Sequence, residues 1–140
     1  MVITLEILNL DFNFITIHGK SRFPGLFVWL RDGTRKPVAI PEGHFLIQAG
    51  KQLEILTGGE ILCGFHEVVY TEKTKEGMLK AKDAGKSTWR VSTTLFSHLR
   101  HDVILKPLPS FENEETIKKY PPMSAYEQLE DELKHINLAK

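Results

Sequence analysis

The sequence predicts a mainly β fold, a barrel or sandwich of short antiparallel strands with helices at its periphery. Most of the 140-residue chain consists of short β-rich runs separated by turn residues. An Asp-Gly pair at positions 32–33 is typical of a hairpin turn. Two stretches, 72–84 and 124–136, instead show helical spacing. The length suits one domain with a single hydrophobic core.

Strands are expected where apolar, β-branched and aromatic residues alternate or cluster between turns. The stretch from Gly19 to Gly25 is expected to be a loop, and Pro41-Glu42-Gly43 a turn. Asp32-Gly33 joins the third and fourth strands as a hairpin. The expected strands cover residues 2–8, 12–18, 26–31, 36–40, 45–49, 61–71, 87–99 and 103–105.

Two helices are expected before the C-terminal region. A short one covers 51–56 and ends at a pair of glycines. The second covers 72–84, which is rich in Lys, Glu and Ala, and Gly85 stands where a helix C-cap glycine would stand. The predicted organisation is a core domain over 1–106, with the second helix as an insertion at about 72–85, followed by a linker and C-terminal helix over 107–140.

The C-terminal region begins with a proline-containing linker. Its acidic run, Glu112 to Glu115, is interpreted as a solvated loop. Ser124 and Glu127 have the spacing of a capping box, which starts a helix. The apolar stripe of that helix would consist of Leu129, Leu133 and Ile136.

Composition excludes several classes of protein. With 18 basic and 18 acidic residues the formal net charge is zero, which argues against non-specific nucleic-acid binding. The single cysteine, Cys63, excludes an intrachain disulfide and fits a reducing compartment, so we expect a cytoplasmic protein. No apolar run reaches about 18 residues, and the N-terminus lacks the features of a signal peptide, so no membrane association is expected.

Four polar residues stand out as candidates for chemistry, although the motifs HExxH, GxSxG, GxGxxG and the P-loop are all absent. His66 lies in an apolar strand, where a histidine is either a hydrogen-bonded core residue or a ligand. Asp11 precedes a β-rich stretch and is either a turn or cap carboxylate or a ligand. Arg90 and Ser92 would share one face of a strand. They either bind a carboxylate group or belong to the solvent-exposed surface.

Several short motifs follow one another in order between Asn9 and Leu95. They are Asp11, Gly25-Leu26-Phe27-Val28, Asp32-Gly33, Pro37-Val38, Pro41-Glu42-Gly43, Ile47-Gln48-Ala49-Gly50, Leu53-Glu54-Ile55-Leu56-Thr57-Gly58-Gly59, His66-Glu67-Val68-Val69 and Arg90-Val91-Ser92. This series resembles the catalytic core of the isopenicillin N synthase-like family of 2-oxoglutarate/Fe(II)-dependent oxygenases. The resemblance implies a double-stranded β-helix (jelly-roll) core, here incomplete, with a peripheral helix and a C-terminal helix.

The resemblance also implies a dioxygenase that oxidises an unidentified small molecule with Fe(II) and the co-substrate 2-oxoglutarate. Asp11 and His66 would be two of the three iron ligands, and the third ligand position falls on Asn9. Arg90 and Ser92 would hold the distal carboxylate of 2-oxoglutarate. A set of two histidines and one carboxylate leaves positions open on Fe(II) for the oxoacid and O₂.

The chain departs from the family pattern in three respects. Asn9 stands where the family has the first histidine of a His-x-Asp motif, and its amide oxygen is a weaker ligand than imidazole. His18 is not expected to substitute for that histidine. The region before Asn9 is much shorter than in the family, so the chain looks like the C-terminal half of an oxygenase. The stretch from His66 to Arg90 is longer than usual because of the helical insertion.

These departures leave two alternatives open. The chain could be a non-catalytic remnant that serves as a binding or interaction module, or the product of an incomplete gene model. A jelly roll without its first strands would expose sheet edges and an apolar face, so we also expect a homo-oligomer.

Overall fold

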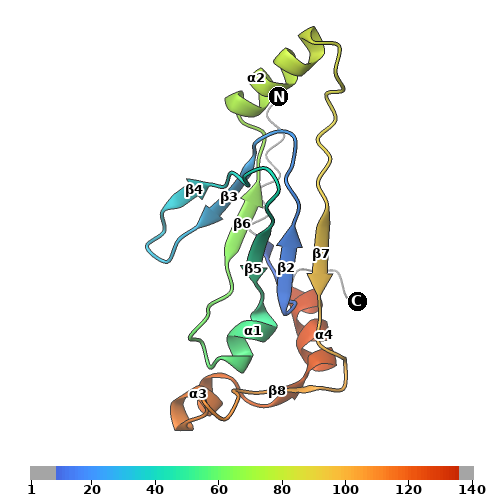
Figure 1. Cartoon of the computed structure of the whole chain (residues 1–140). Coiled ribbons are helices and arrows are strands. Elements are labelled where there is room, and N and C mark those ends of the chain that lie inside the picture. Colours follow the sequence, from blue (N-terminus) through green and yellow to red (C-terminus); the bar gives the residue numbers. More distant parts are fainter. Residues whose placement is uncertain (1–8, 136–140) are drawn as a thin grey trace. The chain divides into compact units, whose positions relative to one another are not determined.

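The computed structural model describes residues 9–135 (Figure 1). Within this range nine strands form three sheets, and four helices connect or follow them, in line with the predicted mainly β class. The predicted strand over 2–8 and Ile136 of the predicted stripe lie outside the described residues. The strands are β1 (Asn9–Leu10), β2 (Ile15–His18), β3 (Leu26–Trp29), β4 (Arg35–Pro37), β5 (Leu46–Ala49), β6 (Phe65–Val68), β7 (Thr94–Ser97), β8 (Ile104–Leu105) and β9 (Met123–Ser124). The helices are α1 (Lys51–Leu56), α2 (Glu72–Asp83), α3 (Glu114–Lys119) and α4 (Ala125–His135).

The chain divides into two compact units that interleave along the sequence. In the described range the first unit comprises residues 9–10, 17–47 and 64–95, and the second comprises 11–16, 48–63 and 96–135. The domain boundary expected at residue 106 stays a prediction. Of the described helices, none is long and apolar enough to cross a membrane.

A four-stranded sheet in the order β1-β6-β3-β4 organises the first unit. Its pairings are antiparallel throughout. In β6, His66 lies opposite Asn9 of β1 on one side and opposite Val28 of β3 on the other. A second sheet has the order β5-β2-β7, and β8 pairs with β9 in a third.

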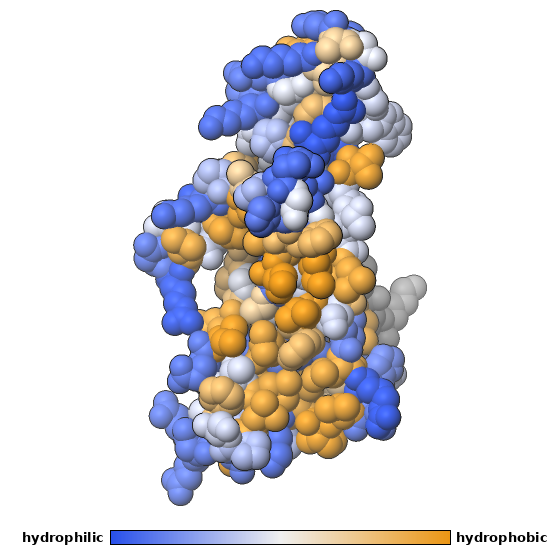
Figure 2. All heavy atoms as spheres, in the orientation of Figure 1, coloured by the Kyte–Doolittle hydropathy of each residue, from blue (hydrophilic) through white to orange (hydrophobic). Residues whose placement is uncertain are grey.

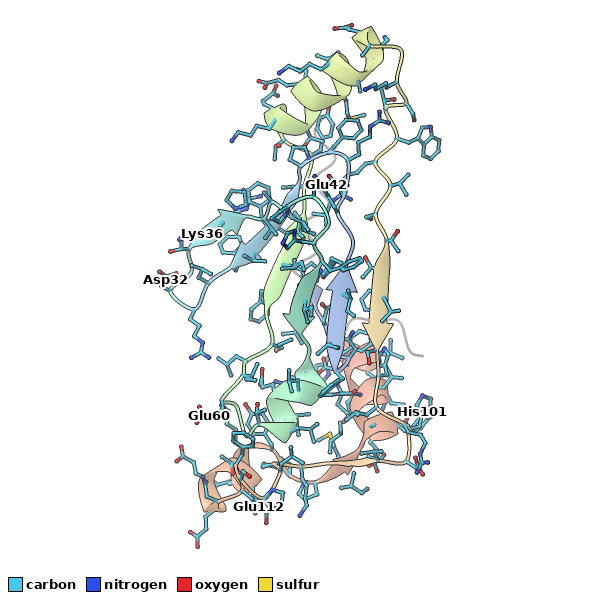
Figure 3. The ribbon with its side chains drawn as sticks, viewed as in Figure 1. Asp32, Lys36, Glu42, Glu60, His101 and Glu112 are labelled. Atoms are coloured by element: carbon cyan, nitrogen blue, oxygen red, sulfur yellow. The ribbon has the colours of Figure 1, made fainter. Side chains whose placement is uncertain are left out.

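The hairpin predicted at Asp32-Gly33 is confirmed between β3 and β4. The amide of Gly33 donates to the Leu30 carbonyl at 3.0 Å, and the Asp32 carboxylate accepts from the Thr34 amide at 2.8 Å. Gly33 has a φ of 79°, a conformation that glycine adopts without a steric penalty. Figure 3 shows Asp32 at the turn and Lys36 on the returning strand.

Three predicted helices are confirmed, and two of them begin at a side-chain cap. The bounds of α1 match the prediction. At the start of α2, Thr71 and Thr74 form a reciprocal capping box, and Gly85 follows the helix with a φ of 65°. At the start of α4, the Glu127 carboxylate accepts from the Ser124 amide at 2.7 Å, as a capping box requires.

Two local predictions are wrong. The acidic run expected to be a solvated loop contributes to α3, which Asn113 and Thr116 cap reciprocally. Its first turn is acidic and its last turn is basic, which complements the helix dipole. The strand expected over 87–99 is limited to Thr94–Ser97. Arg90 and Ser92 therefore precede β7 and do not share one face of a strand.

The buried apolar cluster of the second unit joins its helices to the β8-β9 pair. It consists of Ile55, Leu105, Tyr120 and Ala125, with Leu99 and Met123 packed against it. Many other large apolar side chains are exposed, and Figure 2 shows hydrophobic residues at the surface. Trp89 is 80% exposed and Phe45 is 73% exposed. Much of the apolar surface of the chain is thus not used in its own core.

Candidate functional site

His66 is buried in the middle of the four-stranded sheet. The residue is 7% exposed, and β6 has a hydrogen-bonded neighbour on each side. A central strand holds its side chains at a fixed register, because a slip by one residue would turn every side chain to the other face. The sheet therefore positions His66 firmly, directly across from residue 9.

His18 lies beside His66, although no role at the site is predicted for His18 from the sequence. The centroids of the two imidazole rings are 5.7 Å apart, and the rings meet edge to face at 71°. The Nε2 atom of His18 is buried and has no hydrogen-bond partner among the described residues. A buried ring nitrogen without a partner costs free energy, so this atom is available to a ligand.

The segment that carries Arg90 and Ser92 is held by two hydrogen bonds to the loop after β2. The Gly19 amide donates to the Thr93 carbonyl at 2.8 Å, and Arg22 Nη1 donates to the Ser87 carbonyl at 2.9 Å. Since Gly19 follows His18 directly, this segment runs beside the end of the strand that carries His18. The first unit thus places the Arg-x-Ser segment next to the end of β2, whose His18 contacts His66.

Arg90 has an unused hydrogen-bond donor. Its Nε is buried and has no hydrogen-bond partner within the part of the chain that the structure describes. Burial lowers the pKa of the Arg90 guanidinium, but an arginine remains charged at neutral pH. Ser92 is exposed. A charged donor that lacks a protein partner suits an anionic ligand such as a carboxylate.

Asp11 belongs to the second unit, where the start of α1 holds it. Its carboxylate accepts from Gln48 Nε2 at 2.8 Å, and its carbonyl accepts from the Lys51 amide at 2.7 Å. Asp11 as a whole residue is 8% exposed. The neighbouring Asn13 carbonyl accepts from the Gln52 amide at 3.0 Å, so the loop that contains Asp11 satisfies the first amides of the helix.

The available donors have the chemistry of a divalent metal site. Imidazole nitrogens and a carboxylate are the ligands of non-haem Fe(II) sites. Over residues 9–135, however, three or more His, Cys, Asp or Glu side chains do not gather into a group that could hold a metal ion. Because position 9 is an asparagine, the three predicted ligand positions provide one carboxylate, on Asp11, and one imidazole, on His66. The assigned ligand roles of Asn9, Asp11 and His66 stay predictions, and so do the co-substrate roles of Arg90 and Ser92.

Comparison with known proteins gives a consistent result in sequence and in fold. The chain is 30% identical over 116 residues to kihadalactone A synthase LFS of Citrus sinensis, a match that covers 79% of this chain and 30% of the synthase. It is similar to the crystal structure of a 2OG-Fe(II) oxygenase family protein from Caulobacter crescentus. In that comparison the TM-score is 0.73 at 29% identity, covering 91% of this chain and 39% of the other.

A more distant structure shares the fold. The crystal structure of a dioxygenase for auxin oxidation in rice has a TM-score of 0.69 at 18% identity, over 91% of this chain and 39% of the dioxygenase. No protein-family model matches the chain. The chain spans about a third of the length of these relatives, between 30% and 39%.

Proposed function

Because the chain belongs to the 2-oxoglutarate/Fe(II)-dependent oxygenases, we propose that it forms part of the catalytic core of such an enzyme and oxidises a small molecule. Its joint similarity in sequence and fold to the Caulobacter oxygenase carries this proposal. The isopenicillin N synthase-like group is consistent with these relatives. We further propose that its antiparallel sheets belong to a double-stranded β-helix, and that the protein works in the cytoplasm, where a lone thiol stays reduced.

In this proposal Asp11 and His66 bind Fe(II), and Asn9 occupies the third ligand position with an amide oxygen. Bound Fe(II) would couple the activation of O₂ to the oxidative decarboxylation of 2-oxoglutarate to succinate and CO₂. The protein's own contribution is to place the ligands. The β6 register fixes His66, and the hydrogen bond from Gln48 orients the Asp11 carboxylate.

Arg90 and Ser92 would hold the distal carboxylate of 2-oxoglutarate. The Nε of Arg90, which is buried and has no hydrogen-bond partner among residues 9–135, supports this role, because a carboxylate can accept two parallel hydrogen bonds from a guanidinium. The Ser92 hydroxyl would donate a third. Such contacts orient the co-substrate so that its other end faces the metal.

Anaerobic titration of the chain with Fe(II) and 2-oxoglutarate tests the proposal. The chelate of the oxoacid on an open Fe(II) site absorbs in the visible range, so a saturating band is expected. Arg90→Ala should abolish the band at matched concentrations, whereas Arg31→Ala, a change of an exposed arginine in the hairpin turn, should leave it intact. The absence of a band in the unmodified chain would overturn the proposal for this chain.

A non-catalytic role as a binding module is the second candidate, and Asn9 favours it. An amide binds Fe(II) more weakly than imidazole does, so the replacement could have removed iron binding while the fold was retained. Asn9→His distinguishes the two roles. If turnover of 2-oxoglutarate appears only in this variant, the unmodified chain is a binding module on an intact oxygenase fold.

We also propose that the chain forms a homo-oligomer. All three residues of β4 are exposed, and this strand is at the edge of its sheet. Exposed strand edges and apolar side chains such as Phe45 and Trp89 favour pairing with another copy. Gel filtration over a range of protein concentrations should show a concentration-dependent increase in apparent mass. A monomer at every concentration would count against the homo-oligomer.

A further inference from the structure

We infer that a pocket of the second unit binds a small α-amino acid with an apolar side chain, such as phenylalanine. The pocket has a volume of about 200 Å³. Its lining residues come from α1, from the end of α3 and the residues after it, from β9 and from α4, all within the second unit. None of them is among the residues predicted to bind iron or 2-oxoglutarate.

The body of the pocket is apolar. Ile55, Pro121 and Met123 line it together with Tyr120, which is buried. An apolar cavity of about 150 Å³ can hold a benzene ring, so this pocket accommodates a phenyl or branched aliphatic group. It is smaller than the pockets of about 300–1,000 Å³ that take drug-sized ligands. Its size therefore selects a small molecule with one apolar group.

Gln128 lines the pocket, and a relay of hydrogen bonds fixes which way its amide is turned. The Leu99 amide can only donate, and it donates to Gln52 Oε1 at 3.0 Å. Gln52 Nε2 consequently faces Gln128 and donates to its Oε1 at 3.2 Å. Gln128 is 3% exposed, and its Nε2 is buried without a hydrogen-bond partner in the described range. A carboxylate oxygen of a ligand would satisfy this donor.

Two charges that line the pocket also lack an opposite charge. Lys51 and Asp131 each pair with a neighbour on their own helix, at 2.7 Å and 3.3 Å. Lys119 and Glu132, by contrast, form no salt bridge with any residue between positions 9 and 135. A ligand that carries both a carboxylate and an ammonium complements both charges, whereas a simple acid or a simple amine complements only one.

The spacing of the polar side chains suits the head group of an α-amino acid. Gln128 and Glu132 are four residues apart on α4, so they are neighbours on one face of the helix. The carboxylate and the ammonium of an α-amino acid are attached to one carbon. Gln128 Nε2 would donate to the carboxylate, and the Glu132 carboxylate would accept from the ammonium. Lys119, whose ammonium lies 5.0 Å from the centre of the Tyr120 ring, would pair with the carboxylate beside the apolar wall.

NMR titration of the full chain with L-phenylalanine tests the site without any variant. The Met123 methyl and the Gln128 side-chain amide should shift and saturate in the millimolar range, whereas the methyl of Met78 on α2 should not. Phenethylamine lacks the carboxylate, so it should bind at least about tenfold more weakly than phenylalanine. 3-Phenylpropionate lacks only the ammonium, which pairs with a partly exposed carboxylate, so it should bind about two- to fivefold more weakly.

Variants assign each charge to one end of the ligand. Lys119→Gln should weaken phenylalanine about two- to fivefold and leave phenethylamine unchanged. Glu132→Gln should weaken phenylalanine by a similar factor and leave 3-phenylpropionate unchanged. Lys118→Gln, a change of an exposed lysine in the same helix turn as Lys119, should leave all three affinities unchanged. Circular dichroism of each variant checks that it folds.

Three results would overturn the site. They are the absence of saturable shifts with phenylalanine, equal affinities for phenylalanine and phenethylamine, and a loss in Lys119→Gln that is as large for phenethylamine as for phenylalanine. Neither iron nor 2-oxoglutarate is used in these measurements. The amino-acid site and the proposed oxygenase function can therefore each fail without the other.

Discussion

The hydroxyl of Tyr120 donates a hydrogen bond of 3.0 Å to the buried carboxylate of Glu54. Two further donors reach the same carboxylate, the Lys51 ammonium at 2.7 Å and the Cys63 amide at 2.9 Å. Glu54 is on α1, whereas Cys63 and Tyr120 lie outside it. This carboxylate therefore ties the helix that follows the Asp11 loop to two distant parts of the second unit.

The Glu54 cluster should make stability depend on pH in the acid range. Burial raises the pKa of Glu54, but the hydrogen bonds from Cys63 and Lys51 outweigh it and lower the pKa from 4.5 to about 2. A lowered folded-state pKa stabilises the protein above pH 4.5, and that contribution is lost as the pH falls through about 2. After allowance for solvent screening, the Glu54 cluster contributes roughly 2 kcal/mol to the free energy of unfolding.

Urea unfolding of Glu54→Gln across this pH window checks the prediction. The variant should be less stable at neutral pH and should lose less stability on acidification than the unmodified chain. Glu60→Gln, a change of an exposed carboxylate labelled in Figure 3, should keep the full pH dependence. Parallel pH profiles for the unmodified chain and Glu54→Gln would contradict the prediction.

Cys63 should react slowly with alkylating reagents. Burial raises the pKa of its thiol, and the adjacent Glu54 carboxylate adds to this, so that the pKa reaches about 12. Only the thiolate is nucleophilic, and its fraction at neutral pH is then very small. Mass spectrometry after iodoacetamide treatment should show slow labelling of the native chain and fast labelling in urea. Equal labelling rates in the native chain and in urea would contradict the prediction that Cys63 reacts slowly.

Gly50 should not tolerate a side chain. A Cβ at this position would lie 2.1 Å from the Asn13 carbonyl oxygen and 2.5 Å from its side-chain oxygen. Gly50→Ala would have to displace the loop that contains Asp11, at a cost of about 1–3 kcal/mol or more. Gly19→Ala is the matched control, because its nearest contact would be 3.4 Å. Thermal unfolding measures both, and equal melting temperatures would refute the expectation.

Arg35 should contribute to stability through Glu67. The two side chains form an ion pair, Glu67 is 6% exposed, and the Arg35 guanidinium lies 3.9 Å from the centre of the Phe27 ring. Arg35→Ala leaves a buried carboxylate without this partner, for a loss of about 1–3 kcal/mol. Lys20→Ala breaks an exposed pair with Glu42 and should cost little. Chemical denaturation that gives equal losses for both variants would contradict this.

The features that could be predicted from sequence are those with local causes. The hairpin at Asp32-Gly33 and the start of α4 follow from turn and capping residues within a few positions of each other, and α2 follows from its own composition and the glycine after it. In contrast, α3 was missed because it has only six residues and lies in a proline-containing stretch, where its acidic run was interpreted as a solvated loop.

The candidate site could be predicted only in part, because it depends on which strands meet. The β-rich composition around Arg90 suggested a strand, but the strand itself covers only Thr94–Ser97. The contact between His18 and His66 joins residues of two different sheets, and no spacing along the chain encodes it. The only available signal was that His18 is polar at the end of an otherwise β-branched run.

The sparse burial of α2 predicts where the chain opens first. Of its side chains only Thr74 is buried, through the capping box and a hydrogen bond to the Pro24 carbonyl at 3.1 Å. Local unfolding of its second half therefore breaks few contacts of the β1-β6-β3-β4 sheet. Amide protons there should exchange early, and trypsin should cut first at Lys80 or Lys82. The same property means that a change in the length of this helix should not disturb the strand that carries His66.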